Sequence, residues 1–227
     1  MKTLALDADD TLWENIDFFL EAQAGLCRLL HGYAAPEQVE ENLFKKESLN
    51  VPLYGYGTKS FVLSMVELAI ELTGGAIPSS LILDIHQLGK NILLHPMKLL
   101  RGVEETVPIL ASKYHLVVAT KGELLEQQQK LERSGLKPYV ASMHVMSNKR
   151  KEDYQRLLDV LRVAPEDFIM VGNTLKSDVL PVVSLGGTGI YIPHHYTWEH
   201  EIVSDDSVDS SAYIQLEHFG QLTKTLL

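Results

Sequence analysis

The sequence predicts an α/β protein with a doubly wound parallel sheet and a separate all-helical domain. Over most of the chain, short apolar runs typical of buried strands alternate with helical patterns. One long interval, between roughly residues 14 and 96, instead contains only helical patterns. With 227 residues and 45% hydrophobic content, the chain is long enough for one large domain that carries a smaller insert.

Five apolar runs are predicted as strands, namely Thr3–Leu6, His115–Ala119, Ala141–Val145, Phe168–Val171 and Gly189–Ile192. Three of the later strands are followed by predicted helices at Leu124–Arg133, Asp153–Leu161 and Ser177–Leu185. Such alternation places helices on both faces of a parallel sheet. The polar stretch Ser204–Ser211 is expected to be a surface loop before a final strand or helix.

Four amphipathic stretches predict the helices of the insert, at Ile16–Leu30, Pro36–Lys46, Ser60–Leu72 and Ser79–Leu93. Glycine and proline separate them, for example at Gly32 and Gly74–Gly75. Residues 1–14 and 97–227 are therefore expected to form the sheet domain, and residues 15–96 the helical insert.

Composition narrows the class of function. A net charge of −10 argues against broad binding to nucleic acid or to an anionic membrane, which usually needs a basic surface. Cys27 stands alone, so an intrachain disulfide is excluded. No run approaches the roughly 20 apolar residues that span a bilayer, and the first apolar stretch is too short for a signal peptide. We expect a cytoplasmic protein.

Two carboxylates follow the first predicted strand, at Asp7 and Asp9. In open α/β sheets, ligands bind at the carboxyl ends of the strands. Two acids this close favour a bound cation or a shared proton, and one of them can then serve as a general acid. A DxD pattern by itself is more often only a polar turn.

The second strand leads into Thr120-Lys121-Gly122. The Thr120 hydroxyl and the following N–H groups are suited to phosphate oxygens at a helix N-terminus, although Thr120 also suits an N-cap. Lys121 either contacts substrate or is a solvated surface lysine.

A basic segment, Asn148-Lys149-Arg150-Lys151, follows the third strand. A lysine here can neutralise a nucleophilic carboxylate and an incoming phosphate, and position favours Lys149 over Lys151. Three neighbouring cations are also typical of plain solvated surface.

The fourth strand ends in Gly172-Asn173-Thr174-Leu175-Lys176-Ser177-Asp178. Magnesium prefers hard oxygen ligands in octahedral geometry. Asp7, the backbone carbonyl of Asp9 and a group from this loop, Asn173 or Asp178, would form such a site.

Together these motifs resemble those of the haloacid dehalogenase-like superfamily. The segment DADDT is similar to the family's DxDxT motif, Thr120 to its Ser/Thr motif, Lys149 to its lysine motif, and GNTLKSD to its terminal GDxxxxD motif. The order and approximate spacing match over essentially the whole chain. The helical insert resembles the family's helical cap, which would close over the site and select the substrate.

The resemblance implies a magnesium-dependent phosphatase. Asp7 would attack phosphorus and form an aspartyl-phosphate, and Asp9 would act as general acid and then as general base. Thr120 and Lys149 would hold the phosphoryl group, while Asp178 would anchor the metal or the lysine. These roles agree with the needs of phosphoryl transfer, in which positioning and charge neutralisation dominate.

One residue departs from the family pattern. Asn173 stands where the family usually has a metal-binding aspartate. An amide oxygen can bind Mg²⁺ but adds no negative charge, so we expect weaker metal binding or a larger share carried by Asp178.

Further residues are expected near the substrate. The segment Val51–Lys59 is either a mobile loop that reaches the substrate or an ordinary connector between helices. The residues predicted to contact substrate are Thr11, Tyr56, Lys59, Lys121 and Gly122. Trp13 and Glu14 either border the pocket or serve as a hinge. For the histidines at 194, 195 and 200, a surface loop is favoured over a transition-metal site.

Other functions stay open at this point. A metal-independent haloacid dehalogenase of the same fold attacks carbon with the first aspartate, and Asn173 suits that branch, whereas Asp9 argues for phosphoryl chemistry. A sugar-phosphate mutase would share the intermediate. A catalytically weak binding module is disfavoured by the intact set of site residues. The expected partner is a small phosphorylated metabolite; neither its identity nor the oligomeric state follows from the sequence.

Overall fold

The computed structural model describes residues 1–203 and 209–227. The chain divides into two compact units. The core unit comprises Met1–Ile16 and Met97–Leu227, and the helical unit comprises Asp17–Pro96. Among the described residues, no helix is long and apolar enough to cross a membrane.

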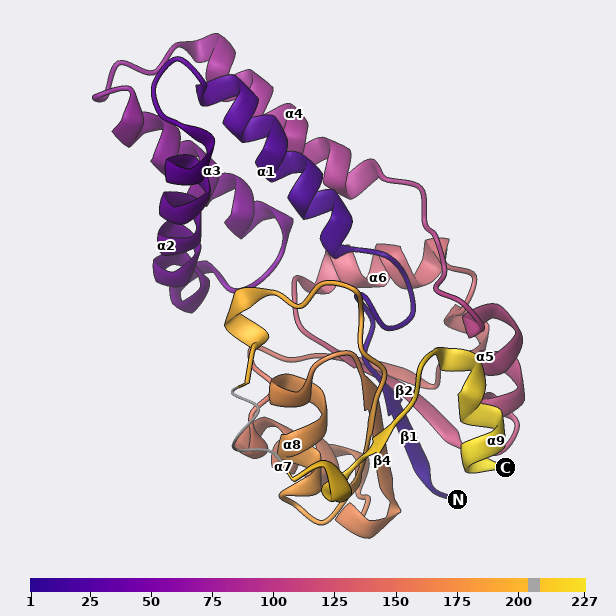
Figure 1. Ribbon diagram of the computed structural model, residues 1–227. Coiled ribbons are helices and arrows are strands. Elements are labelled where there is room, and N and C mark those ends of the chain that lie inside the picture. Colours follow the sequence, from indigo (N-terminus) through magenta and orange to yellow (C-terminus); the bar gives the residue numbers. More distant parts are fainter. Residues whose placement is uncertain (204–208) are drawn as a thin grey trace. The chain divides into compact units, whose positions relative to one another are not determined.

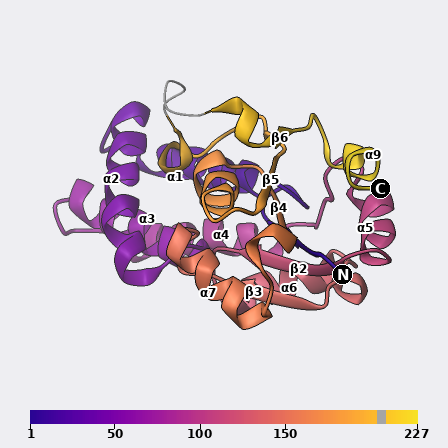
Figure 2. The ribbon, with the colours of Figure 1, turned by 90° about the horizontal axis from the view of Figure 1, so that it is seen from below.

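The core unit is built on a six-stranded sheet in the order β3-β2-β1-β4-β5-β6, and every neighbouring pair is parallel (Figures 1 and 2). The strands are β1 (Thr3–Leu6), β2 (His115–Thr120), β3 (Ser142–Val145), β4 (Phe168–Gly172), β5 (Thr188–Tyr191) and β6 (Ile214–Gln215). The prediction of a doubly wound parallel sheet is therefore confirmed, and β6 lies where a final strand or helix was expected.

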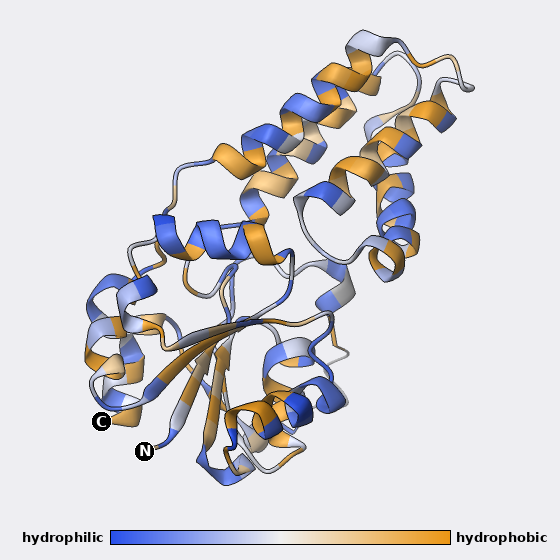
Figure 3. Cartoon of the chain, turned by 180° about the vertical axis from the view of Figure 1, so that it is seen from behind, coloured by the Kyte–Doolittle hydropathy of each residue, from blue (hydrophilic) through white to orange (hydrophobic). Residues whose placement is uncertain are grey.

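Helices cover both faces of the sheet. They are α5 (Val103–Ala111), α6 (Leu124–Arg133), α7 (Lys151–Leu161), α8 (Leu180–Val183) and α9 (Leu222–Leu226). Side chains alternate along β1, so Leu4 and Leu6 pack with residues of α5 and α9, whereas Ala5 packs with α7 and α8. Figure 3 shows the strands as predominantly hydrophobic, as expected for a sheet buried on both faces.

Two parts of the core unit differ from expectation. Helix α5 was not predicted. The helix expected from Ser177 begins instead with a π-helical turn, Leu175–Val179, before α8. In this turn the N–H groups of Asp178 and Val179 both point to the carbonyl of Thr174, at 3.1 and 3.3 Å. Of the predicted loop Ser204–Ser211, residues 204–208 lie outside the described residues.

The helical unit contains the four expected helices, α1 (Ile16–Leu30, which begins at the unit boundary), α2 (Pro36–Tyr54), α3 (Thr58–Leu72) and α4 (Ser79–Leu94). They enclose their own hydrophobic core, which includes Leu26, Leu43, Met65 and Ile85. Helix α2 extends to Tyr54, beyond the predicted end at Lys46. Pro52 lies in its last turn, and the helix ends two residues after it.

The segment Val51–Lys59, interpreted from the sequence as either a mobile loop or a connector between helices, is mostly helical. Residues 51–54 are helical and α3 begins at Thr58, so the connector is only Gly55–Gly57. Both glycines have positive φ, 78° and 120°, which permits the sharp turn.

A short antiparallel contact joins the two segments of the core unit that flank the helical unit. Trp13 forms an isolated bridge with Leu99. The N–H of Glu14 donates to the carbonyl of Lys98 at 3.0 Å, and that of Leu100 donates to the carbonyl of Leu12 at 3.0 Å. We call this contact the neck.

Candidate active site

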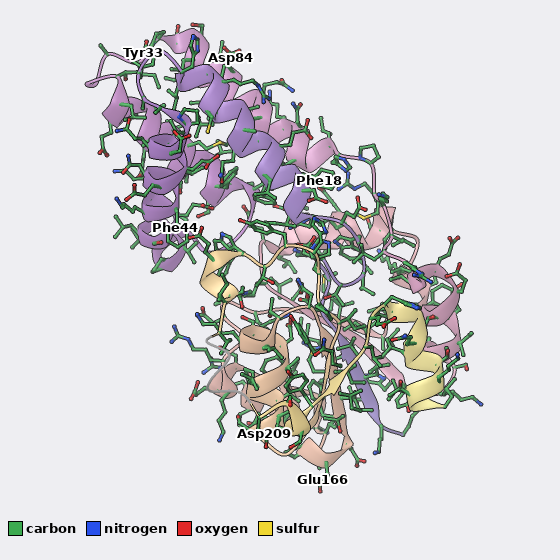
Figure 4. All side chains as sticks on the ribbon, viewed as in Figure 1. Phe18, Tyr33, Phe44, Asp84, Glu166 and Asp209 are labelled. Carbon is green, nitrogen blue, oxygen red and sulfur yellow. The ribbon has the colours of Figure 1, made fainter. Side chains whose placement is uncertain are left out.

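The predicted motifs follow β1, β2, β3 and β4, and the site forms at the carboxyl ends of these strands. Strands β1 and β4 are neighbours, and the N–H of Asp7 extends their pairing by donating to the carbonyl of Val171 at 2.9 Å. From β1 the chain order proceeds outward to β2 and β3, and from β4 it proceeds outward in the other direction to β5 and β6 (Figure 2). Such a switch point is where open α/β sheets bind ligands. Glu166, labelled in Figure 4, precedes β4 and marks the opposite end of the strands.

Lys149 links two carboxylates at this edge. Its ammonium donates to Oδ1 of Asp7 and, at 2.6 Å, to Oδ1 of Asp178. All three side chains are buried, with Lys149 only 3% exposed. Lys151, the alternative weighed from the sequence, is exposed. The structure thus brings Lys149 to the first aspartate.

The charges in this cluster perturb one another. Burial raises the pKa of Asp7 to about 7, Lys149 acts against that rise, and the charge of Asp178 adds to it. Burial opposes the charge of Lys149, but Asp178 and Asp7 outweigh it and raise its pKa. Two carboxylates around one ammonium leave a negative excess, which favours a proton or a cation at Asp7.

Asp178 is fixed by the loop after β4. Its Oδ2 accepts hydrogen bonds from the N–H of Thr174 at 3.0 Å and from the Thr174 hydroxyl at 2.8 Å. A Cβ atom at Gly172 would lie 2.3 Å from Cγ of Asp178. The glycine therefore makes room for the carboxylate that holds Lys149.

Thr11 joins the loops after β1 and β4. Its hydroxyl lies 3.0 Å from Oδ2 of Asp7 and 3.2 Å from Oδ1 of Asn173. The carboxylate oxygen of Asp7 and the amide oxygen of Asn173 thus flank one hydroxyl, which has a single proton to donate.

These oxygens fit a hard cation. Among the described residues, no group of three or more His, Cys, Asp or Glu side chains is arranged to hold a metal. Mg²⁺, however, binds through one or two carboxylates and keeps several waters. Asp7 with the amide oxygen of Asn173 meets that requirement, whereas both oxygens of Asp178 already accept hydrogen bonds within the protein.

Asp9 is anchored differently from Asp7. Its Oδ1 accepts a hydrogen bond from the indole N–H of Trp13 at 2.7 Å, and its Oδ2 accepts one from Nε2 of Gln127 at 2.8 Å. The ammonium of Lys130 lies 3.0 and 3.2 Å from the two oxygens. Sequence analysis missed Gln127 and Lys130; the available signal was a helix, α6, with few apolar residues to bury.

The last residue of β2, Thr120, and the segment that follows it lie beside these groups. Thr120 is buried, and its hydroxyl donates to the carbonyl of Lys121 at 3.2 Å. Lys121 pairs with Glu201 and contacts the hydroxyl of Ser177 at 3.1 Å, so it is not simply solvated. Glu201 was also missed, because it comes from a short 3₁₀ helix, Glu199–Glu201, 80 residues further along the chain. Gly122 has φ 112°, a conformation that favours glycine.

The remaining predicted residues are not joined to the site by these contacts. Tyr56 and Lys59 belong to the helical unit, where Tyr56 is half-buried and Lys59 is exposed, and their contact with substrate stays a prediction. The rings of His194 and His195 lie 4.1 Å apart, and Nε2 of His194 is 3.9 Å from a carboxylate oxygen of Asp10. The side chain of His200 lies outside the described part of the chain.

Comparison with known proteins places the chain in a family. The model of the haloacid dehalogenase-like hydrolases matches residues 1–186. The chain belongs to this family, and it is a hydrolase by that membership. The resemblance inferred from the four motifs is thereby confirmed.

Three similar proteins refine the comparison. The structure of a haloacid dehalogenase-like family hydrolase from Xanthomonas campestris is 38% identical, covers 87% of this chain and 84% of its own, and gives a TM-score of 0.81. N-acylneuraminate-9-phosphatase from Rattus norvegicus and Homo sapiens is 28% identical over 114 residues, or 48% of this chain. The match spans 46% of those relatives' length. A 2-haloacid dehalogenase from Pseudomonas syringae shares the fold at 19% identity, with a TM-score of 0.63 over the whole of this chain and 98% of its own.

Proposed function

We propose that this hydrolase is a Mg²⁺-dependent phosphatase that cleaves a small phosphomonoester through an aspartyl-phosphate on Asp7. The observation that carries the proposal is the buried pair of Asp7 and Lys149, with a second, separately anchored carboxylate two residues away at Asp9. A nucleophile beside a fixed cation, and a second acid close by in the sequence, are the parts that phosphoryl transfer to a carboxylate requires. The phosphatase relatives matched over about half of their length support the same class.

The first half of the reaction uses Asp7 as nucleophile. A carboxylate oxygen of Asp7 forms a bond to phosphorus while the bond from phosphorus to the leaving oxygen breaks. Asp9 gives a proton to that oxygen, so the product leaves as an alcohol. Lys149 stays cationic because its pKa is raised, and it offsets the negative charge of the incoming phosphoryl group.

The second half regenerates the enzyme. Asp9, now ionised, removes a proton from a water molecule, whose oxygen attacks phosphorus. The bond between phosphorus and Asp7 breaks, inorganic phosphate leaves, and Asp7 regains its carboxylate. Thr120 and the N–H groups after it are suited to hold phosphoryl oxygens near the start of α6.

Bound Mg²⁺ would be held by Asp7, Asn173 and the backbone carbonyl of Asp9, and it would supply further neutralisation of phosphoryl charge. In the structure Asp178 contacts Lys149 and Thr174, which supports a role in fixing the lysine. The helical unit is assigned the role of a cap that selects the substrate.

A dehalogenase is the second candidate, and Asn173 is the observation that favours it. That reaction attacks carbon and needs no metal. The presence of Asp9 argues for the phosphatase, because a general acid assists the departure of an alcohol. A mutase would share the first half-reaction and differ in the acceptor.

The test is a turnover screen with and without Mg²⁺. The substrates are p-nitrophenyl phosphate, a panel of phosphorylated metabolites that includes N-acylneuraminate 9-phosphate, and 2-haloacids. We expect Mg²⁺-dependent release of phosphate by the wild type. Asp7→Asn should lose several orders of magnitude, since an amide cannot form the acyl phosphate.

Two outcomes would reject the proposal. Asp7→Asn that keeps more than about a tenth of wild-type turnover, roughly 1.4 kcal/mol in barrier, would remove Asp7 as the nucleophile. Release of halide from 2-haloacids in the presence of a chelator, without phosphatase activity, would establish the dehalogenase instead.

A further inference from the structure

Helix α6 buries a polar face where a core helix usually buries apolar side chains. Figure 3 shows this helix as predominantly hydrophilic. Its buried residues include Glu126, Gln127 and Lys130, and the last two are 1% and 6% exposed. Charged residues are rarely buried this far unless they are paired, because removing them from water costs several kcal/mol. The polar face therefore needs a partner.

That partner is Asp9. Lys130 contacts both of its carboxylate oxygens, at 3.0 and 3.2 Å, and Gln127 contacts Oδ2 at 2.8 Å. Lys130 is itself oriented by Glu126 at 3.1 Å and by Oδ1 of Asn15 at 2.8 Å. The polar face of α6 thus converges on one carboxylate that lies more than 100 residues earlier in the sequence.

The amide of Gln127 is oriented toward acceptors. Its Nε2 donates to Asp9 and, at 3.1 Å, to the carbonyl of Lys121. Its buried Oε1 has no hydrogen-bond partner among the described residues. A Cβ at position 122 would approach Nε2 to 3.0 Å, so Gly122 leaves the amide its space. The contact with Asp9 is thus made although another buried polar atom stays unsatisfied, which is unfavourable in a folded protein.

The side chain of Asp9 is fixed by hydrogen bonds but stays partly exposed to solvent. The indole of Trp13 supplies another donor at 2.7 Å, while the side chain of Asp9 keeps 24% of its surface exposed. The carboxylate therefore has a fixed orientation and an accessible side. These are the two conditions for delivering a proton to a defined point on a substrate.

We infer that Lys130 and Gln127 are positioning residues that fix the carboxylate of Asp9 for proton exchange with the leaving group. The inference rests on the proposed function, in which Asp9 acts as general acid. In this role both residues act through Asp9. Their removal should impair reactions whose leaving group needs a proton more than reactions whose leaving group does not.

A purely structural role gives a different expectation. If Lys130 only neutralises Glu126 and Gln127 only fills space, their loss lowers stability and reduces all activities by a common factor. The ratio of activities toward two leaving groups separates the alternatives.

The experiment compares p-nitrophenyl phosphate, whose leaving group is stable as an anion, with phenyl phosphate, whose leaving group is much more basic. For each variant kcat/KM is measured with saturating Mg²⁺, because this ratio reports the steps through cleavage. The variants are Gln127→Met, Lys130→Met and Lys130→Arg, with Asp9→Asn as reference. Gln128→Met and Lys137→Met are matched controls, since Gln128 is exposed on the same helix and Lys137 pairs with Glu132 at the surface.

We expect kcat/KM for phenyl phosphate to fall about tenfold to a hundredfold in Gln127→Met and Lys130→Met, within the usual contribution of general acid catalysis. For p-nitrophenyl phosphate the loss should stay below about threefold, and KM should change little. Lys130→Arg should recover most of the phenyl phosphate activity. Both controls should match the wild type.

The outcomes distinguish failure of the positioning role from failure of the proposed phosphatase function. If the wild type is active and Asp9→Asn shows the leaving-group effect, but Gln127→Met and Lys130→Met lower both activities equally or not at all, the positioning role is rejected and the phosphatase stands. If the wild type cleaves neither ester, the proposed function fails and this inference with it. Lys130→Met leaves Glu126 without its lysine, so melting temperatures are measured; if that variant does not fold, Gln127→Met decides the question.

Discussion

The hydroxyl of Thr11 lies 3.2 Å from Oδ1 of Asn173, although the two residues are 162 positions apart. The same hydroxyl lies 3.0 Å from Oδ2 of Asp7, so the structure places the amide oxygen of Asn173 and a carboxylate oxygen of Asp7 around one hydroxyl group. The substitution that departs from the family pattern therefore keeps an oxygen in place and removes only its charge.

Restoring that charge should tighten Mg²⁺ binding. We expect Asn173→Asp to lower the half-saturating Mg²⁺ concentration severalfold, because a carboxylate adds a formal negative charge beside a divalent cation. Turnover need not rise, since the added anion also repels phosphate. The measurement is a Mg²⁺ titration of phosphatase activity.

Asp178→Asn is the companion variant for this titration. It removes the anion that holds Lys149, so the half-saturating concentration should rise or turnover should disappear. A Mg²⁺ dependence that neither variant moves would show that the loop after β4 plays no part in metal binding.

Beryllium fluoride should bind at Asp7. With Mg²⁺ it mimics a phosphorylated carboxylate. A ligand that binds only the native state raises the free energy of unfolding by about 2.7 kcal/mol at a hundredfold excess over Kd, and the melting temperature rises accordingly. The shift is read by thermal denaturation with each component omitted in turn. A Mg²⁺-dependent shift of the same size in Asp7→Ala would place the ligand elsewhere.

Gly172→Ala should displace Asp178 and thereby lower activity. The new Cβ would lie 2.3 Å from Cγ of Asp178, so the carboxylate must move away from Lys149. We expect a loss of about 1–3 kcal/mol in the free energy of unfolding, as for other overpacked positions, together with a large loss of kcat. Gly32→Ala is the matched control, since a Cβ there meets nothing within 4 Å. Wild-type kinetics in Gly172→Ala would show that the position of Asp178 is unimportant.

Glu47 makes the stability of the helical unit depend on pH. Burial raises its pKa from 4.5 to about 7. Between these values the unfolded chain releases the proton and the folded chain keeps it, so stability falls as pH rises through this window and stays low above it. Glu47→Gln should therefore stabilise the protein at pH 8 by about 1–3 kcal/mol, and have little effect below pH 4.5.

The measurement is urea denaturation at pH 4.5 and pH 8. Glu41→Gln is the control on the same helix, because Glu41 is exposed and paired with Lys45. An equal effect of Glu47→Gln at both pH values would mean that this carboxyl does not titrate differently in the folded state.

Much of the site could be predicted because it follows from local patterns and one topological rule. Apolar runs mark parallel strands, and the carboxyl ends of parallel strands meet at one edge, so the residues after β1, β2 and β4 had to converge. Position in the segment already favoured Lys149 over Lys151, and the structure brings Lys149 to Asp7 and leaves Lys151 exposed.

The features that the sequence did not predict depend on contacts between residues far apart in the chain, which no local pattern contains. Helix α5 has an apolar face but also carries Pro108, which weakens a helical prediction. Gln127 and Lys130 look like ordinary surface residues of a polar helix until Asp9 is placed beside them, 118 and 121 residues away in sequence. Glu201 likewise can be recognised as part of the site only from its ion pair with Lys121.

The neck has a consequence for how such a protein can change its specificity. Because Glu14 and Lys98 are already joined by a backbone hydrogen bond, the ends of the intervening segment are pinned together by the core itself. Residues 17–96 are therefore an insertion whose two ends are held together by the neck. Its length and sequence can change without shifting the pairing of β1 with β2. The sheet edge of the core unit and the helical unit can therefore vary independently of each other. A graft of another family member's helical segment at this junction would inherit an intact catalytic edge.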